Sequence, residues 1–272
     1  WIGGNNNKEI SGQVFFVNWD GEKQQLHITE LPPLPMPLDN LSATYADGCL
    51  YVAGGKGKPQ TVPIGKDGSQ TAPTNPLFSL QLTPSLQKEW VRLPDFPGPA
   101  RIQPVLTAQQ SEDGIRLYLA GGFQPASAHQ EAIVCTDMLS YHPKTKQWRN
   151  EGFLPSLAGG SHRTVTGGCA IASGDSSILL VGGVNYDRFR DALNHPEPDY
   201  LLHPVDWYKF NTSLLQYNTF TKHWTHLGNY EELARAGAGI ANNANTVIII
   251  GGELKPGIRT PEVNAFKLTC HP

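Results

Sequence analysis

An acid and two cations stand close together in the last part of the sequence, directly after a glycine pair. They are Glu253, Lys255 and Arg259, and the glycines are Gly251 and Gly252. A carboxylate can take up or release a proton, and a guanidinium can bind an anion through its planar fork. These residues therefore suit proton transfer on a small anionic ligand. In a simpler reading, Glu253 and Arg259 pair with each other across a tight turn.

The residues around this group predict how it is positioned. Residues 246–250 (TVIII) are all β-branched, which is typical of a buried strand. The two glycines then allow the backbone to turn, and Pro256-Gly257 marks a second turn. We therefore expect a short, stiff loop at a strand end, where side chains are held well for chemistry.

The composition favours many short strands over helices. The chain has 272 residues, with 28 Gly, 22 Pro and 9% aromatic residues but 2 Met. A net charge of -3 without long runs of like charge gives no sign of a nucleic-acid or membrane partner. No apolar stretch approaches the ~20 residues that span a bilayer. The four cysteines lack CxxC spacing, so we expect no zinc site.

An apolar run that ends in a glycine pair recurs five times along the chain. The second glycines are Gly4, Gly55, Gly122, Gly183 and Gly252, spaced by 51, 67, 61 and 69 residues. In each complete unit one strand precedes the run, a third follows it, and a fourth often begins with tryptophan. Four short strands per unit at this period are the signature of a propeller blade, whereas a two-sheet sandwich would not repeat the same residues so far apart.

These units resemble the Kelch repeat over essentially the whole chain. The resemblance implies an all-β fold, a Kelch β-propeller, as a single domain over residues 1–272. The chain opens inside the second strand of one blade and closes after the third strand of another, so two of the five blades are partial. Because a closed ring has no open edges, we expect a segment upstream of Trp1 to supply the missing strands.

The loops after the glycine pairs and the loops that enter each blade should meet at one end of the propeller, here called the mouth. Three entry loops carry an arginine at what read as matching positions. The predicted substrate-binding residues are these arginines and side chains of the post-glycine loops: Arg101, Arg163, Arg235, Asn6, Asn185 and Lys255. Such a cationic mouth suits a small anion. Alternatively, each arginine bridges blades.

A long insertion follows the fourth glycine pair. Residues 186–211 hold many aromatic and aliphatic side chains among their charges. We expect a packed cap over the mouth, helical over residues 188–194.

Two stretches resemble one particular Kelch family, the bacterial N-acetylneuraminate epimerases or sialic acid mutarotases. They are residues 182–189 (GGVNYDRF) and residues 252–260 (GELKPGIRT). The resemblance implies a six-bladed propeller that interconverts the α and β anomers of sialic acid, with Glu253 and Arg259 as catalytic residues. It implies no cofactor and a periplasmic or otherwise extracytoplasmic location. Because the motif lies in the last blade, the chain is similar to the cyclically permuted branch of the family.

Two other functions compete with this reading. A non-catalytic Kelch propeller would bind a protein or carbohydrate partner at the same end, and a broad apolar patch there would favour it. A copper oxidase would need Tyr, His and Cys ligands gathered at the axis, and no such cluster stands out among the nine histidines. The sequence leaves the oligomeric state open, a homodimer included.

Overall fold

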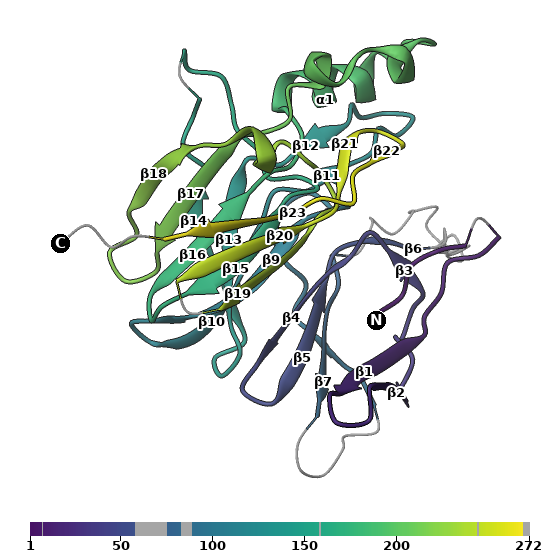
Figure 1. Cartoon of the computed structure of the whole chain (residues 1–272), viewed down its shortest axis with the longest axis vertical. Coiled ribbons are helices and arrows are strands. Elements are labelled where there is room, and N and C mark those ends of the chain that lie inside the picture. The colour runs from purple at the N-terminus through teal and green to yellow at the C-terminus, as the bar shows by residue number, and fades with distance from the viewer. Residues whose placement is uncertain (7, 58–74, 83–88, 158, 244, 269–272) are drawn as a thin grey trace, which may run out of the picture.

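A computed structural model describes residues 1–6, 8–57, 75–82, 89–157, 159–243 and 245–268. It is a β-propeller in which antiparallel sheets follow one another along the chain (Figure 1). Three sheets have four strands and one has three. The predicted all-β propeller is thus confirmed, and each sheet corresponds to one unit of the glycine-pair repeat.

The three complete blades share one order, in which the strand before the glycine pair lies innermost. The first comprises β4 (Ser42–Ala46), β5 (Cys49–Ala53), β7 (Leu77–Gln81) and β8 (Val91–Leu93), and the second comprises β9 (Val105–Ser111), β10 (Gly114–Ala120), β13 (Asp137–His142) and β14 (Gln147–Phe153). The third comprises β15 (Cys169–Ser173), β16 (Ser177–Val181), β17 (Ser213–Asn218) and β18 (Trp224–Asn229). Strands β4, β9, β15 and β19 contact one another in succession, which places them around the axis.

The first and last sheets are smaller, as the repeat predicts. At the C-terminal end, β19 (Gly239–Asn243), β20 (Thr246–Ile250) and β23 (Val263–Lys267) form the three-stranded sheet. At the other end, β1 (Val14–Asp20) pairs with β2 (Gln25–Leu31), and Ile2 bridges to Val14 beside them. Within the described residues, no strand pairs with the outer edge of β23.

Apolar side chains fill the space between successive blades, and the repeated tryptophans help to join them. Leu117, Leu119 and Tyr141 of the second blade pack with Tyr51 and Leu77 of the first, and all five are buried. The indole N–H groups of two tryptophans then donate to the preceding unit: Trp90 to Pro32 O at 2.8 Å and Trp148 to Pro94 O at 2.9 Å. The periodic tryptophan therefore both buries apolar surface and satisfies a backbone carbonyl of its neighbour.

The glycine pairs bind the entry loop of the next blade, through a backbone carbonyl at Gly55 and Gly183 and through the Thr166 hydroxyl at Gly122. Gly55 N–H donates to Arg101 O at 2.8 Å, and Gly183 N–H donates to Arg235 O at 2.9 Å. Gly183 has φ +88°, and a Cβ there would lie 2.7 Å from Thr166 O. Glycine is required because both the left-handed backbone and the close approach exclude a side chain.

A second set of backbone hydrogen bonds runs around the axis, here called the axial belt. Its members are Asn40, Gln103, Gly167 and Gly237, which stand just before the inner strands and all have left-handed φ values between 51° and 69°. Each N–H donates to the carbonyl of the member before it: Gln103 to Asn40 at 2.8 Å, Gly167 to Gln103 at 3.0 Å and Gly237 to Gly167 at 2.7 Å. These hydrogen bonds fix the position of each entry loop along the propeller axis relative to the neighbouring loops.

Short hairpins and one helical segment gather at the end of the propeller that the glycine pairs face. The hairpins are β11 (Phe123–Gln124) with β12 (Ile133–Val134) and β21 (Glu253–Lys255) with β22 (Ile258–Arg259), and β3 (Leu38–Asp39) pairs with β6 (Lys56–Gly57). Helix α1 (Tyr186–Asn194) lies beside β11, β12, β21 and β22 (Figure 1). Three 3-10 turns accompany it: η1 (Tyr200–Leu202), η2 (Val205–Tyr208) and η3 (Glu231–Leu233). Among the described residues, no helix has the length and apolar character needed to cross a membrane.

Candidate active site at the mouth

The β21–β22 hairpin brings Glu253 and Arg259 face to face. The two residues are direct cross-strand partners, and Arg259 Nε donates to Glu253 Oε1 at 3.3 Å. The Glu253 side chain is 31% exposed and that of Arg259 is 82% exposed. The predicted pairing across a tight turn therefore exists, and both groups remain accessible to a ligand. An exposed pair of this kind adds little stability, so stability does not explain why both charges are there.

Backbone pairing anchors Glu253 to the entry loop of its own blade. Its N–H donates to Ala236 O at 2.7 Å, and Ala236 N–H donates back to Glu253 O at 3.0 Å. Ala236 precedes Gly237, a member of the axial belt. The carboxylate thus stands on a backbone fixed at the mouth of the propeller, which is the placement that proton transfer requires.

Lys255 fastens the hairpin to the insertion. Its ammonium donates to Leu201 O at 3.1 Å and to His203 O at 2.7 Å, and it lies 5.9 Å from the centre of the Tyr208 ring. The sequence predicts substrate binding by Lys255. The structure shows that two of its three donors hold the cap, and its part in substrate binding stays a prediction.

The insertion forms the expected cap, and its helix begins two residues earlier than predicted. Asn185 caps helix α1, because its Oδ1 accepts from Arg188 N–H at 3.0 Å. At the other end, Asn194 exchanges hydrogen bonds with the backbone of Ala132, at 2.7 and 3.3 Å, and Phe189 contacts Phe123 with ring centres 5.1 Å apart. The cap therefore spans from the β11–β12 hairpin to the β21–β22 hairpin.

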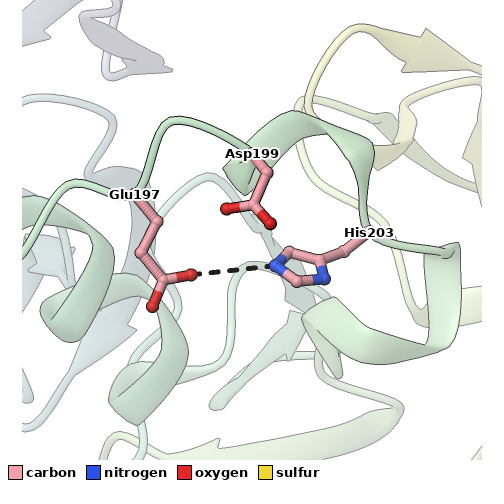
Figure 2. A group of neighbouring side chains, drawn as sticks. All are labelled: Glu197, Asp199 and His203. Atoms are coloured by element: carbon pink, nitrogen blue, oxygen red, sulfur yellow. Dashed lines mark ion pairs between the residues drawn. The ribbon is translucent and has the colours of Figure 1, made fainter.

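Three titratable side chains lie next to the point where Lys255 holds the cap (Figure 2). Glu197 Oε2 is 3.8 Å from His203 Nε2, and Asp199 completes a group whose ligand atoms lie within 4.8 Å of one another. The His203 ring stacks on Trp207 at 3.8 Å, and both carboxylates are exposed. The fold of the cap brings Glu197 next to His203, and no local sequence pattern marks the two as partners.

Two of the three predicted arginines are used inside their own blades. Arg101 donates to Gly121 O at 3.1 Å and to both oxygens of Asp137 at 2.9 and 2.8 Å. Arg235 repeats the pattern with Gly251 O at 3.1 Å and with Glu262 and Asn264 at 3.2 and 2.9 Å. Their side chains are 0% and 2% exposed. Both therefore join the entry loop to the third strand, which is the blade-bridging alternative.

The prediction that Arg163 occupies the matching position is wrong. Backbone bonding makes Thr166 the counterpart of Ala236, since Val184 N–H donates to Thr166 O at 3.0 Å, and Gly167 stands in the axial belt. The residue equivalent to Arg235 is thus Val165, and Arg163 lies two residues earlier. Spacing from the following strand makes the three arginines look equivalent. Which residue takes part in the axial belt depends on backbone hydrogen bonds that the sequence does not reveal.

The asparagine at the first glycine pair is part of a local turn. Asn6 Oδ1 accepts from the N–H groups of Lys8 and Glu9 at 3.1 and 3.0 Å, and Asn6 is exposed. No contact between Asn6 and the β21–β22 hairpin occurs among the described residues. Its predicted part in binding stays a prediction.

An apolar hollow lies away from these charges. It measures about 820 Å³ and is lined by β1, β2 and the first complete blade, with Phe16, Leu31 and Leu80 among its residues. The charged hairpin and cap are not part of it. Its position gives no support to an apolar docking patch at the mouth.

Comparison with known proteins decides the family. The model of the family described as N-acetylneuraminate epimerase matches residues 31–271, which is most of the chain. The chain belongs to the N-acetylneuraminate epimerase family. The residues of GELKPGIRT that carry Glu253 and Arg259 lie inside the matched range.

Individual relatives agree with the family match. The chain is 30% identical to N-acetylneuraminate epimerase of Haemophilus influenzae (strain PittEE), over 84% of this chain and 60% of that protein. It is 27% identical to the enzyme of the same name from Pasteurella multocida (strain Pm70), over 74% of this chain and 52% of that protein. The chain thus spans little more than half the length of these relatives.

A solved structure supports the fold. The structure of YjhT superposes with a TM-score of 0.65 at 23% identity, covering 89% of this chain and 69% of that one. At this identity the likeness carries the propeller architecture and no more.

Proposed function

We propose that this member of the epimerase family is a sialic acid mutarotase, which speeds the exchange between the α and β anomers of N-acetylneuraminate. One observation carries the proposal: Glu253 and Arg259 face each other across an anchored hairpin at the mouth, 3.3 Å apart, with both side chains open to a ligand. The names of the relatives supply the substrate class.

The reaction needs two proton movements that one carboxylate can perform. The Glu253 carboxylate takes the proton of the anomeric hydroxyl as the bond between the anomeric carbon and the ring oxygen breaks. The ring oxygen receives a proton, and the open keto form results. Rotation about the bond next to the carbonyl exposes its other face, and the reverse steps close the ring as the other anomer. Atoms balance without an oxidant, a reductant or a metal.

Arg259 steadies the charge that moves during these steps. Its Nε contacts Glu253, and its two terminal nitrogens have no hydrogen-bond partner among the described residues. A guanidinium beside the reacting carbon stabilises negative charge on the ring oxygen, and its planar fork orients an anionic substrate against the carboxylate.

The test is a direct measurement of anomer exchange by NMR. The protein should raise the exchange rate of N-acetylneuraminate well above the rate in buffer, and it should leave the exchange of a neutral sugar such as glucose unchanged. An exchange rate equal to that of buffer would refute the proposal.

A further inference from the structure

In the part of the chain that the structure describes, the buried guanidinium of Arg163 has no hydrogen-bonding or ionic partner. The Arg163 residue is 7% exposed, and its Nε and Nη1 atoms are buried without a hydrogen-bond partner. No hydrogen bond or ion pair involves its guanidinium among the described residues. Arg101 and Arg235 are equally buried, but each is held by a carboxylate of its own blade.

The offset of Arg163 explains why its blade gives it no acid. The position that meets the third strand is occupied by Val165. By strand register the counterpart of Asp137 and Glu262 is Ser213, and the two residues before it, Asn211 and Thr212, are not acids either. Asn211 is itself committed, since its amide donates to the carbonyls of Thr164, Gly182 and Val184 at 2.7, 3.2 and 3.0 Å.

A buried guanidinium without an anion is unfavourable. Burial lowers the pKa of Arg163, yet arginine keeps its proton in proteins, so the charge stays. Removing a charge from water is compensated only by an opposite charge and by hydrogen bonds. Where such a group lies beside a ligand site, an anion that binds there supplies the missing opposite charge and hydrogen-bond acceptors.

The chain around Arg163 places it under the cap, on the side of the mouth. Its neighbour His162 contacts Tyr186, the first residue of helix α1, with ring centres 5.1 Å apart. On the other side, Thr164 donates to Cys135 O at 2.7 Å. Four residues later Gly167 bonds to Gly237, next to the backbone partner of Glu253. The entry loop that carries Arg163 thus adjoins the entry loop to which Glu253 is anchored, at one end of the propeller.

We propose that Arg163 is the receptor for the carboxylate of the bound sugar acid. This inference rests on the proposed function for the identity of the ligand. It divides the work between two arginines: buried Arg163 binds the carboxylate through its unused donors, and exposed Arg259 acts beside Glu253 on the reacting oxygens. The arrangement would select sugar acids over neutral sugars, because only an anion relieves the buried charge.

The experiment compares N-acetylneuraminate with its methyl ester, which keeps the anomeric hydroxyl and lacks the negative charge. Binding of both to wild type, Arg163→Met and Arg163→Lys is measured by calorimetry. We expect wild type to prefer the acid. Arg163→Met should lose at least about tenfold in affinity for the acid and less than about threefold for the ester. Arg163→Lys should recover part of the preference.

Melting temperatures separate binding from a structural role. Arg163→Met should melt at or above the wild-type temperature, because an uncompensated charge is removed, whereas the control Arg101→Met should melt lower, because Asp137 loses its partner. An unchanged acid-to-ester ratio in a folded Arg163→Met protein would overturn the inference, as would a loss of stability equal to that of Arg101→Met. Wild type that binds the acid through Arg163 without exchanging anomers would refute the proposed function and leave the anion site standing.

Discussion

At the scale of single residues, the charged groups of this propeller differ in whether the blades already use them. The terminal nitrogens of Arg101 and Arg235 donate hydrogen bonds within their own blades, and the ammonium of Lys255 donates two to the cap. Among the described residues, the side chains of Glu253 and Arg259 form hydrogen bonds only with each other. Residue type alone therefore does not distinguish a structural charged group from one available to a ligand. The number of donors and acceptors left without a partner distinguishes them.

Glu151 illustrates the scaffold class and gives a prediction with a pH dependence. Its carboxylate is 4% exposed and accepts from Ser140 at 2.5 Å, Arg149 at 2.8 Å and Tyr217 of the next blade at 3.0 Å. Burial raises the pKa of Glu151, but these hydrogen bonds outweigh it and the pKa is lowered below 4.5. We expect Glu151→Gln to cost about 2 kcal/mol of unfolding free energy at pH 7.

The sign of the pH effect follows from the lowered pKa. The ionised form is favoured in the folded state, so the contribution is complete above the unfolded pKa and is lost as the pH falls below it. Urea unfolding from pH 7 to pH 3 should show the wild-type and Glu151→Gln curves converging at acid pH. The exposed variant Glu131→Gln should match wild type throughout, and a gap that widened toward acid pH would contradict the assignment.

At the scale of elements, the hairpin and the cap are coupled through one side chain. Lys255→Met removes both hydrogen bonds to the backbone of η1 and its neighbour. We expect hydrogen exchange in residues 200–208 to become at least about tenfold faster, since each bond to a charged donor contributes about 1.5–3 kcal/mol. Lys209→Met, an exposed change in the same cap, is the control. Equal protection in both variants would show that Lys255 does not hold the cap.

The glycine pairs give a second element-scale prediction. Gly183→Ala places a Cβ 2.7 Å from Thr166 O in a left-handed backbone, so it should cost roughly 3 kcal/mol or more. Gly174→Ala has a similar positive φ, but no atom lies within 4 Å of its Cβ, so it should cost about 1 kcal/mol. Chemical denaturation measures both. Similar losses would mean that close approach between blades does not matter.

At the scale of the whole molecule, the sequence predicts the features that recur in every blade for the same physical reason. Glycine pairs mark the left-handed approach of neighbouring blades, and tryptophans mark the contact with the preceding unit. The predicted strands accordingly coincide with β4–β5, β9–β10, β15–β16 and β19–β20. The turns on both sides of Lys255 were also predictable, because Gly251-Gly252 and Pro256-Gly257 mark them in the sequence; the structure pairs the expected loop as the β21–β22 hairpin.

What the sequence did not predict depends on register and on distant contacts. Arg163 looked equivalent to Arg101 and Arg235, but the belt bond of Gly167 shifts it by two residues and leaves it without an acid. The carbonyl partners of Lys255 lie about fifty residues earlier in the chain and were not predicted, while its part in substrate binding stays a prediction. Such partners come from packing in three dimensions, and no local pattern encodes them.

We expect the Glu253 carboxylate to move the proton of the anomeric hydroxyl. The variant Glu253→Gln keeps the shape of the side chain and removes its basicity. Glu232→Gln is the control, because Glu232 is exposed and lies in the segment that enters the same blade. Exchange between the anomers of N-acetylneuraminate, followed by NMR, should fall at least about 100-fold in Glu253→Gln, while affinity for the sugar stays within about threefold and Glu232→Gln stays near wild type. Exchange by Glu253→Gln at the wild-type rate would contradict the account.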